Sequence, residues 1–291
     1  MLECGTTNRD SAQTVHKAAA RFDARRIYTV LFIVPLLYAA IRFFPPAVFT
    51  GLVAVAGCLA LRELYRLCFQ VERQPLMVAI GLAGCVALIV SPHLPGLAQP
   101  GLLVLLVGIL SIPVLIKTPL DQSVKDAALA LTGMMYIGLT LGYLVAVRLL
   151  PQGEWLLFFL LLVTWAADTG AYYVGTLYGQ RLIAPRISPK KTMEGLAGGL
   201  LAALLVAIVA RWGFWSDLSI WHGLLLAVLL TFAGLWGDLV ESAIKRSVGV
   251  KDSGGLLPGH GGMLDRLDSL LFSAPTFYYY ATSTRGIGPL T

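Results

Sequence analysis

The stretch 237–269 combines carboxylates, basic side chains and glycines at spacings that suit phosphate chemistry. Asp238, Glu241 and Ser242 stand at positions i, i+3 and i+4, so on a helix they share one face. Lys245 extends that face by about one further turn. The spacing therefore predicts a helix that presents acidic, hydroxyl and basic groups along a single side.

A second pair of carboxylates, Asp265 and Asp268, is again three residues apart, at the start of the next predicted helix. Carboxylates that converge at a membrane surface are costly unless a cation binds them. Hard divalent ions such as Mg²⁺ take oxygen ligands, usually one or two carboxylates together with substrate phosphates and water. The acidic groups of this stretch therefore point to a divalent-cation site.

Basic side chains and a glycine-rich turn around His260 lie between and beside the two acidic pairs. Positive charges and closely approaching backbone N–H groups are suited to binding a polyphosphate. The alternative is a salt-bridged loop in which Asp and Arg pair at a helix start, which explains any one pair but not the whole cluster. The basic residues expected to hold phosphates are Lys245, Arg246, Lys251 and Arg266.

A second stretch, 188–195, places two lysines beside two hydroxyls, just before a predicted helix start. Ammonium and hydroxyl groups arranged in this way suit a clamp for a phosphate. A Lys-Lys pair is also a common anchor on the cytoplasmic side of a membrane helix, so this alternative stays open. The candidate clamp residues are Ser188, Lys190, Lys191 and Thr192.

Asp168 is a third candidate because it stands near the end of an apolar run that is long enough to cross a membrane. An ionisable residue in such a place is a functional candidate by default. The alternative is a structural lock, in which Asp168 pairs with Lys190 or Arg246. The sequence alone does not decide between the two.

The elements that must position these groups are membrane helices. Hydrophobic residues make up 57% of the 291 residues, charged residues make up 13%, and the mean hydropathy is +0.76. A soluble domain carries about 25% charged residues, so this chain cannot cover itself with a wetted surface. The net charge of +6 comes without the long basic runs of a nucleic-acid groove, and the four cysteines form no CxxC pair. The composition predicts an all-α, polytopic integral membrane protein.

Nine apolar runs approach the length of roughly 20 residues that a membrane helix needs. They are 27–44, 48–67, 76–91, 98–116, 127–149, 155–175, 196–212, 220–237 and 269–282. If the N-terminus is cytoplasmic, most of the 22 basic residues fall on the cytoplasmic side. This asymmetry agrees with the positive-inside rule. The few exceptions are Arg42, Arg148, Arg211 and Arg285.

This topology divides the chain into three parts and places its unusual residues on one side of the membrane. A polar cytoplasmic tail covers 1–26, spans one to five cover 27–150, and spans six to nine form a catalytic region at 151–291. The two polar connections of that last region, 176–195 and 238–268, both fall on the cytoplasmic side.

The stretch 242–268 resembles the signature of the phosphatidate cytidylyltransferases, also called CDP-diacylglycerol synthases. The stretches around Asp168 and at 188–195 are also similar to this family and stand in the right order, so the resemblance covers roughly residues 160–282. Within 242–268 every fixed position is met, including Ser242, Lys245, Arg246, Lys251, Asp252, Pro258, His260, Gly261, Gly262, Asp265, Arg266 and Asp268.

The resemblance implies that CTP and phosphatidate react to give CDP-diacylglycerol and pyrophosphate, a step of phospholipid biosynthesis. The lipid phosphate is an ionised nucleophile, so catalysis rests on alignment and charge neutralisation rather than on a strong base. The implied cofactor is Mg²⁺, with a second cation left open, held by Asp238, Asp265 and Asp268. The implied catalytic residues also include Ser242 and His260. Of these, His260 would donate to the leaving group or orient the loop. The implied substrate-binding residues are Asp168, Ser188, Lys190, Lys191, Thr192, Lys245, Arg246, Lys251 and Arg266.

The same resemblance implies an enzyme integral to the plasma membrane, the inner membrane of a bacterium, with its active site on the cytoplasmic face. CTP, phosphatidate and the lipid bilayer are the expected partners, nucleic acid is not, and a homodimer is suggested by the family alone. One alternative is a cytidylyltransferase for another lipid phosphate, such as an isoprenoid ether lipid. Another is a cation-coupled carrier, whose polar residues would gather near the bilayer midplane. An enzyme that consumes CDP-lipids would need a D-G-x-x-A-R run, which this sequence lacks.

Overall fold

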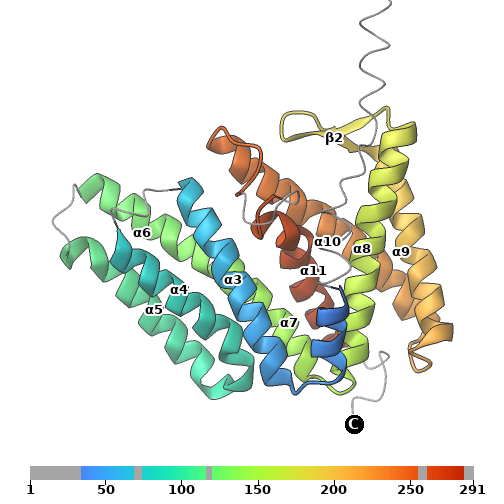
Figure 1. Cartoon of the computed structure of the whole chain (residues 1–291), viewed down its shortest axis with the longest axis horizontal. Coiled ribbons are helices and arrows are strands. Elements are labelled where there is room, and N and C mark those ends of the chain that lie inside the picture. Colours follow the sequence, from blue (N-terminus) through green and yellow to red (C-terminus); the bar gives the residue numbers. More distant parts are fainter. Residues whose placement is uncertain (1–33, 69–73, 116–119, 255–260, 285–291) are drawn as a thin grey trace, which may run out of the picture.

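The computed structural model describes residues 34–68, 74–115, 120–254 and 261–284, and nearly all of them are helical (Figure 1). This confirms the prediction of an all-α membrane protein. Residues 34–42 form a first helical segment. The elements that follow are α3 (Pro46–Cys68), α4 (Pro75–Val90), η2 (Ser91–His93), α5 (Pro95–Leu115), α6 (Leu120–Met134), the π-helical turn η3 (Met135–Leu139), α7 (Thr140–Leu149), α8 (Gly153–Tyr178), β1 (Leu182–Ala184), β2 (Ser188–Thr192), α9 (Met193–Gly213), α10 (Ile220–Ser247) and α11 (Leu264–Ser283).

Each of the nine predicted runs overlaps a helix within the described residues. The number of spans, the cytoplasmic N-terminus and the division at residue 150 stay predictions, and the tail 1–26 lies outside the described residues. Six helical segments are long and apolar enough to cross a membrane: Pro46–Cys68, Pro75–His93, Gln122–Leu149, Gly153–Tyr178, Met193–Gly213 and Ile220–Ser247.

The outward faces of these helices carry large apolar side chains. Trp212 is 83% exposed, Trp221 is 76% exposed and Leu201 is 68% exposed. Extended apolar surface of this kind is rare on a monomeric soluble protein, and lipid tails cover it at no cost. Between helices, by contrast, small residues allow close approach. A Cβ on Gly198 of α9 would lie 2.4 Å from Cβ of Val174 on α8, so this helix pair packs nearly backbone to backbone.

Helix α11 lies in the middle of the helical arrangement. In Figure 1, α3 to α7 lie on one side and α8 and α9 on the other, with α10 and α11 between them. Helix α11 contacts α3 and α7 on the first side, α8 on the second, and α10 beside it. A residue at the start of α11 is therefore within reach of groups from both ends of the sequence.

A short antiparallel hairpin, β1–β2, joins α8 to α9 within the predicted connection 176–195, with Leu182 opposite Thr192. The sequence predicts a helix start near Glu194 but no strands here, because strands of three and five residues are too short to show an alternating pattern. Thr192 ends the hairpin and caps α9, since its Oγ1 accepts a hydrogen bond of 3.1 Å from the Gly195 N–H. This junction fixes the two preceding lysines beside the helix ends.

Candidate functional site

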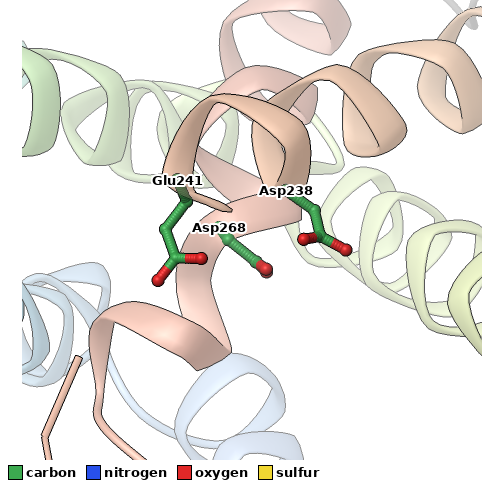
Figure 2. Close-up of side chains that lie close together, drawn as sticks. All are labelled: Asp238, Glu241 and Asp268. Atoms are coloured by element: carbon green, nitrogen blue, oxygen red, sulfur yellow. The ribbon is translucent and has the colours of Figure 1, made fainter. Parts of the chain in front are cut away.

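Three carboxylates converge where α10 meets α11. Asp238 and Glu241 project from α10 and Asp268 projects from α11, with Asp268 between the other two (Figure 2). One oxygen of each residue lies within 4.8 Å of one oxygen of the other two. This arrangement confirms that α10 carries a polar face at the predicted i, i+3, i+4 spacing, because Ser242 Oγ also donates to Asp238 Oδ1 at 3.2 Å.

Two lysines supply positive charge to this carboxylate group from different elements. Lys191 Nζ, on β2, lies 2.6 Å from Asp238 Oδ2. Lys245 Nζ, on α10, lies 2.6 Å from Glu241 Oε2, whose side chain is fully buried. A buried carboxylate without a cationic partner would be strongly disfavoured. The two ion pairs therefore offset the charges of two of the three carboxylates, Asp238 and Glu241, whereas no ion pair to Asp268 is present among the described residues.

Asp265 lies beside the carboxylate group but has its own set of partners. Its Oδ1 is 2.6 Å from Lys245 Nζ. Its Oδ2 accepts hydrogen bonds from the Gly262 N–H at 2.8 Å, from the Ser253 N–H at 3.2 Å and from Ser253 Oγ at 3.0 Å. Asp265 thus ties the chain before α11 to α10 through Lys245.

The charge state of Asp265 follows from these partners. The residue stands in the first turn of α11, outside the six candidate spans. Burial alone would raise the pKa of its carboxyl group, but hydrogen bonds from Lys245 Nζ and from backbone N–H groups outweigh burial and lower that pKa to about 2. Asp265 is therefore a carboxylate at any physiological pH.

A cavity of about 370 Å³ opens next to the carboxylate group. Its wall combines hairpin residues with residues of α8, α9, α10 and α11, so both polar connections of the predicted catalytic region contribute to one site. The residues that the sequence analysis selected and that line this cavity are Asp168, Ser188, Lys190, Lys191, Thr192, Asp238, Asp265 and Asp268.

The remaining expected residues stand around this cavity rather than in its wall. Arg246 donates to the carbonyl oxygens of Ile187, at 3.5 Å, and Val250, at 3.3 Å, and so joins the hairpin to the end of α10. Lys251 and Arg266 are exposed. His260 lies outside the described residues, so its expected role stays a prediction.

Asp168 does not form the structural lock that was the alternative to a functional role. It accepts a hydrogen bond of 3.4 Å from Ser269 Oγ on α11. Within the described part of the chain, no ion pair joins Asp168 to Lys190 or to Arg246. Its presence in the cavity wall instead leaves it available to a bound molecule.

Two carboxylates of this region were absent from the expected ligand and substrate residues. Glu241 belongs to the carboxylate group, and its signal was the i, i+3 spacing from Asp238. Glu63, on α3, lies under the start of α11 and is 7% exposed. The only sequence signal for Glu63 was a single acidic residue near the end of an apolar run, which marks a functional candidate in membrane helices.

Comparisons with known proteins identify the family of this chain. A family model described as "Cytidylyltransferase family" matches residues 24–284. A phosphatidate cytidylyltransferase of Staphylococcus haemolyticus is 46% identical over 153 residues, which are 53% of this chain and 58% of that protein. The protein of that name from Bacillus subtilis is 45% identical over 146 residues, or 50% of this chain and 54% of that protein. One from Staphylococcus epidermidis is 43% identical over 175 residues, or 60% and 66%. These alignments span less than two thirds of each relative.

Proposed function

This chain belongs to the cytidylyltransferase family, and from that membership we propose that it transfers the cytidylyl group of CTP to phosphatidate. The products would be CDP-diacylglycerol and pyrophosphate, and the relatives from which the acceptor is taken are named phosphatidate cytidylyltransferase. The observation that carries the proposal is the cavity itself, in which the hairpin lysines face the carboxylates of α10 and α11. Phosphate groups and a divalent cation together match that pattern of charge.

In the proposed reaction, an oxygen of the lipid phosphate attacks the α-phosphorus of CTP. A new P–O bond forms to the lipid, and the bond from the α-phosphorus to the oxygen that bridges to the β-phosphorus breaks. That oxygen leaves with pyrophosphate. Because the nucleophile is already ionised, the chain has to align the two phosphates and compensate their charge rather than remove a proton. Lys190 and Lys191 line the cavity, and their ammonium groups would bind phosphate oxygens.

A divalent cation fits the carboxylate group. Asp238, Glu241 and Asp268 offer only oxygen donors, and these lie close enough together to share one ion, which is the donor chemistry that Mg²⁺ prefers. We propose that Asp238 and Asp268, with Glu241, would hold it, and that Asp265 supports them through Lys245. When bound, Mg²⁺ would neutralise the charge that develops on the phosphates.

The site lies at one end of the helices that build it. The carboxylates of α10 occupy its last three turns and those of α11 its first two turns, whereas a cation-coupled carrier would place such groups near the bilayer midplane. We place this end at the cytoplasmic face, because the positive-inside rule assigns the connections 176–195 and 238–268 to that side and because CTP is cytosolic.

Purified protein supplied with phosphatidate, Mg²⁺ and α-labelled CTP is expected to move label into the lipid phase and to release pyrophosphate. EDTA should abolish this transfer, and added Mg²⁺ should restore it. Without the cation, the carboxylates would repel the negatively charged phosphates. Extraction of the lipid phase followed by counting measures the transfer. If CTP binds but no label reaches phosphatidate, then the acceptor is another lipid phosphate. If neither CTP binding nor transfer occurs, the proposed activity is wrong.

A Lys191→Ala variant is expected to raise the KM for CTP by about tenfold or more, because it removes a half-buried charge that pairs with Asp238. Arg186→Ala is the matched comparison. The Arg186 side chain stands in the turn of the same hairpin, is exposed and does not line the cavity, so we expect a change in KM of less than about threefold. Initial rates over a range of CTP concentrations measure both. Equal effects of the two substitutions would contradict the proposed role of the ion pair.

A further inference from the structure

The N-terminal half of the chain contributes one buried carboxylate to the framework of the site. Glu63 stands on α3, about 200 positions before the residues that it contacts on the C-terminal side of the sequence. Its Oε1 accepts a hydrogen bond of 3.0 Å from the Met263 N–H, and its Oε2 accepts one of 2.9 Å from the Leu264 N–H. Ser253 Oγ donates to Oε2 as well, at 3.1 Å.

These contacts give hydrogen-bond acceptors to the backbone N–H groups at the start of α11. The first N–H groups of a helix have no partner within the helix, and the residue that precedes α11, Met263, provides no side-chain cap. The Glu63 carboxylate supplies two acceptors there, and its negative charge is favoured beside the positive end of the helix dipole. A residue of α3 thereby caps α11 from outside.

A continuous chain of polar contacts leads from this cap to the carboxylate group. Ser253 Oγ lies 3.1 Å from Glu63 Oε2 and 3.0 Å from Asp265 Oδ2. Asp265 Oδ1 lies 2.6 Å from Lys245 Nζ, which is also 2.6 Å from Glu241 Oε2. Three side chains, those of Ser253, Asp265 and Lys245, therefore connect Glu63 to Glu241 of the carboxylate group.

The backbone at Gly254 and Gly262 packs tightly against the Glu63 carboxylate and Ser253. A Cβ on Gly262 would lie 2.0 Å from Ser253 Oγ and 2.4 Å from Glu63 Oε2. A Cβ on Gly254 would lie 2.9 Å from Glu63 Oε1. All three distances are below 3.0 Å, so a side chain at either position would have to displace Ser253 Oγ or the Glu63 carboxylate from its place.

We propose that Glu63 is a positioning residue for the cytidylyl transfer. It fixes the first turn of α11, and with it the orientation of Asp265 and Asp268 toward α10. Glu63 itself does not line the cavity, so it acts on the reaction through these residues and not by touching substrate. This inference rests on the proposed function for its catalytic part, whereas the fixing of α11 stands on the contacts alone.

The test compares Glu63→Gln with the full-length wild-type protein in detergent. Glutamine offers one oxygen where the structure uses two, so its NH₂ group must face the N–H of either Met263 or Leu264, and one hydrogen bond is lost. We expect kcat to fall about 10- to 100-fold, as for a small misplacement of reacting groups, while the KM for CTP changes less than about twofold. Glu154→Gln is the matched control. Glu154, in the first turn of α8, is a partly exposed carboxylate that pairs with Arg42 and makes none of the contacts described for Glu63.

A second readout does not depend on activity. Amide hydrogen exchange of the segment 261–268 should become faster in Glu63→Gln, while exchange in α8 and α9 should match the wild type. Faster exchange with a wild-type kcat would overturn the positioning role. A lower melting temperature with an unchanged kcat for the folded fraction would overturn it as well, because Glu63 would then be structural only.

Two further outcomes are separable. If Glu63→Gln does not fold, Glu63→Asp replaces it, since the shorter side chain keeps the charge but draws the carboxylate away from the Met263 and Leu264 N–H groups. A wild-type kcat in that variant would overturn the proposal. If the wild-type protein itself transfers no label to phosphatidate, the proposed function fails, and unchanged exchange of 261–268 in Glu63→Gln would then show independently that Glu63 does not fix α11.

Discussion

An Asp238→Asn variant is expected to lose about 10²- to 10³-fold in kcat for cytidylyl transfer, the loss typical of deleting one preorganised electrostatic group. Asp238 belongs both to the carboxylate group and to the ion pair with Lys191. Its carboxylate belongs to the group that lies within 4.8 Å, and it also pairs with Lys191 at 2.6 Å. An amide keeps the shape of the side chain but removes the charge, so both the lysine and the proposed cation lose their partner.

The measurement is the initial rate of label transfer from CTP to the lipid phase, with size-exclusion profiles and melting temperatures to establish that the variant is folded. Asp217→Asn is the control, because Asp217 is an exposed aspartate just before the opposite end of α10. Near wild-type transfer by Asp238→Asn would show that the carboxylate assignment is wrong.

An Asp265→Asn variant is expected to lose a comparable factor of about 10²–10³ in kcat and also some stability. The two oxygens of Asp265 accept from donors only, namely Lys245 Nζ on one side and Ser253 and Gly262 on the other. An asparagine presents NH₂ to one of these sides whichever way it is oriented. Leaving a largely buried donor without its acceptor costs about 1–3 kcal/mol.

Asp265→Glu separates charge from geometry at this position, since it keeps the two acceptor oxygens on a longer side chain. We expect Asp265→Glu to retain more of the folding stability than Asp265→Asn, measured by thermal unfolding in detergent, but to remain slow in transfer. Full activity of the asparagine variant would exclude a role of the Asp265 charge. Equal stability of both variants would show that its hydrogen bonds do not depend on that charge.

The arrangement along α10 could be predicted because a helix converts spacing directly into a shared face. Asp238, Glu241 and Ser242 are neighbours by helical geometry alone, and the structure places them so. The assignment within α11 could not be obtained in the same way. Asp265 and Asp268 share a helix face in the sequence, yet Asp268 joins the carboxylate group whereas Asp265 is held by Lys245 and by the chain before α11.

The reason is that the partners of Asp265 come from a turn whose path depends on tertiary contacts. Gly261 has a positive φ of 76°, which a sequence can suggest by a glycine but cannot position. Glu63 was harder still. Its three hydrogen bonds all reach residues about 200 positions away, and no local pattern on α3 indicates which helix start it caps.

The Glu63 contact also bears on whether the region that carries the family signature can fold without the N-terminal half of the chain. Every residue of that signature lies after α7, so a fragment that begins there would contain the complete motif. The same fragment would leave the Met263 and Leu264 N–H groups without their acceptor and would uncover the side of α11 that packs on α3 and α7. The motif therefore does not define a self-sufficient module. Swapping this region between relatives would require the acidic residue of α3 to be exchanged or matched along with it.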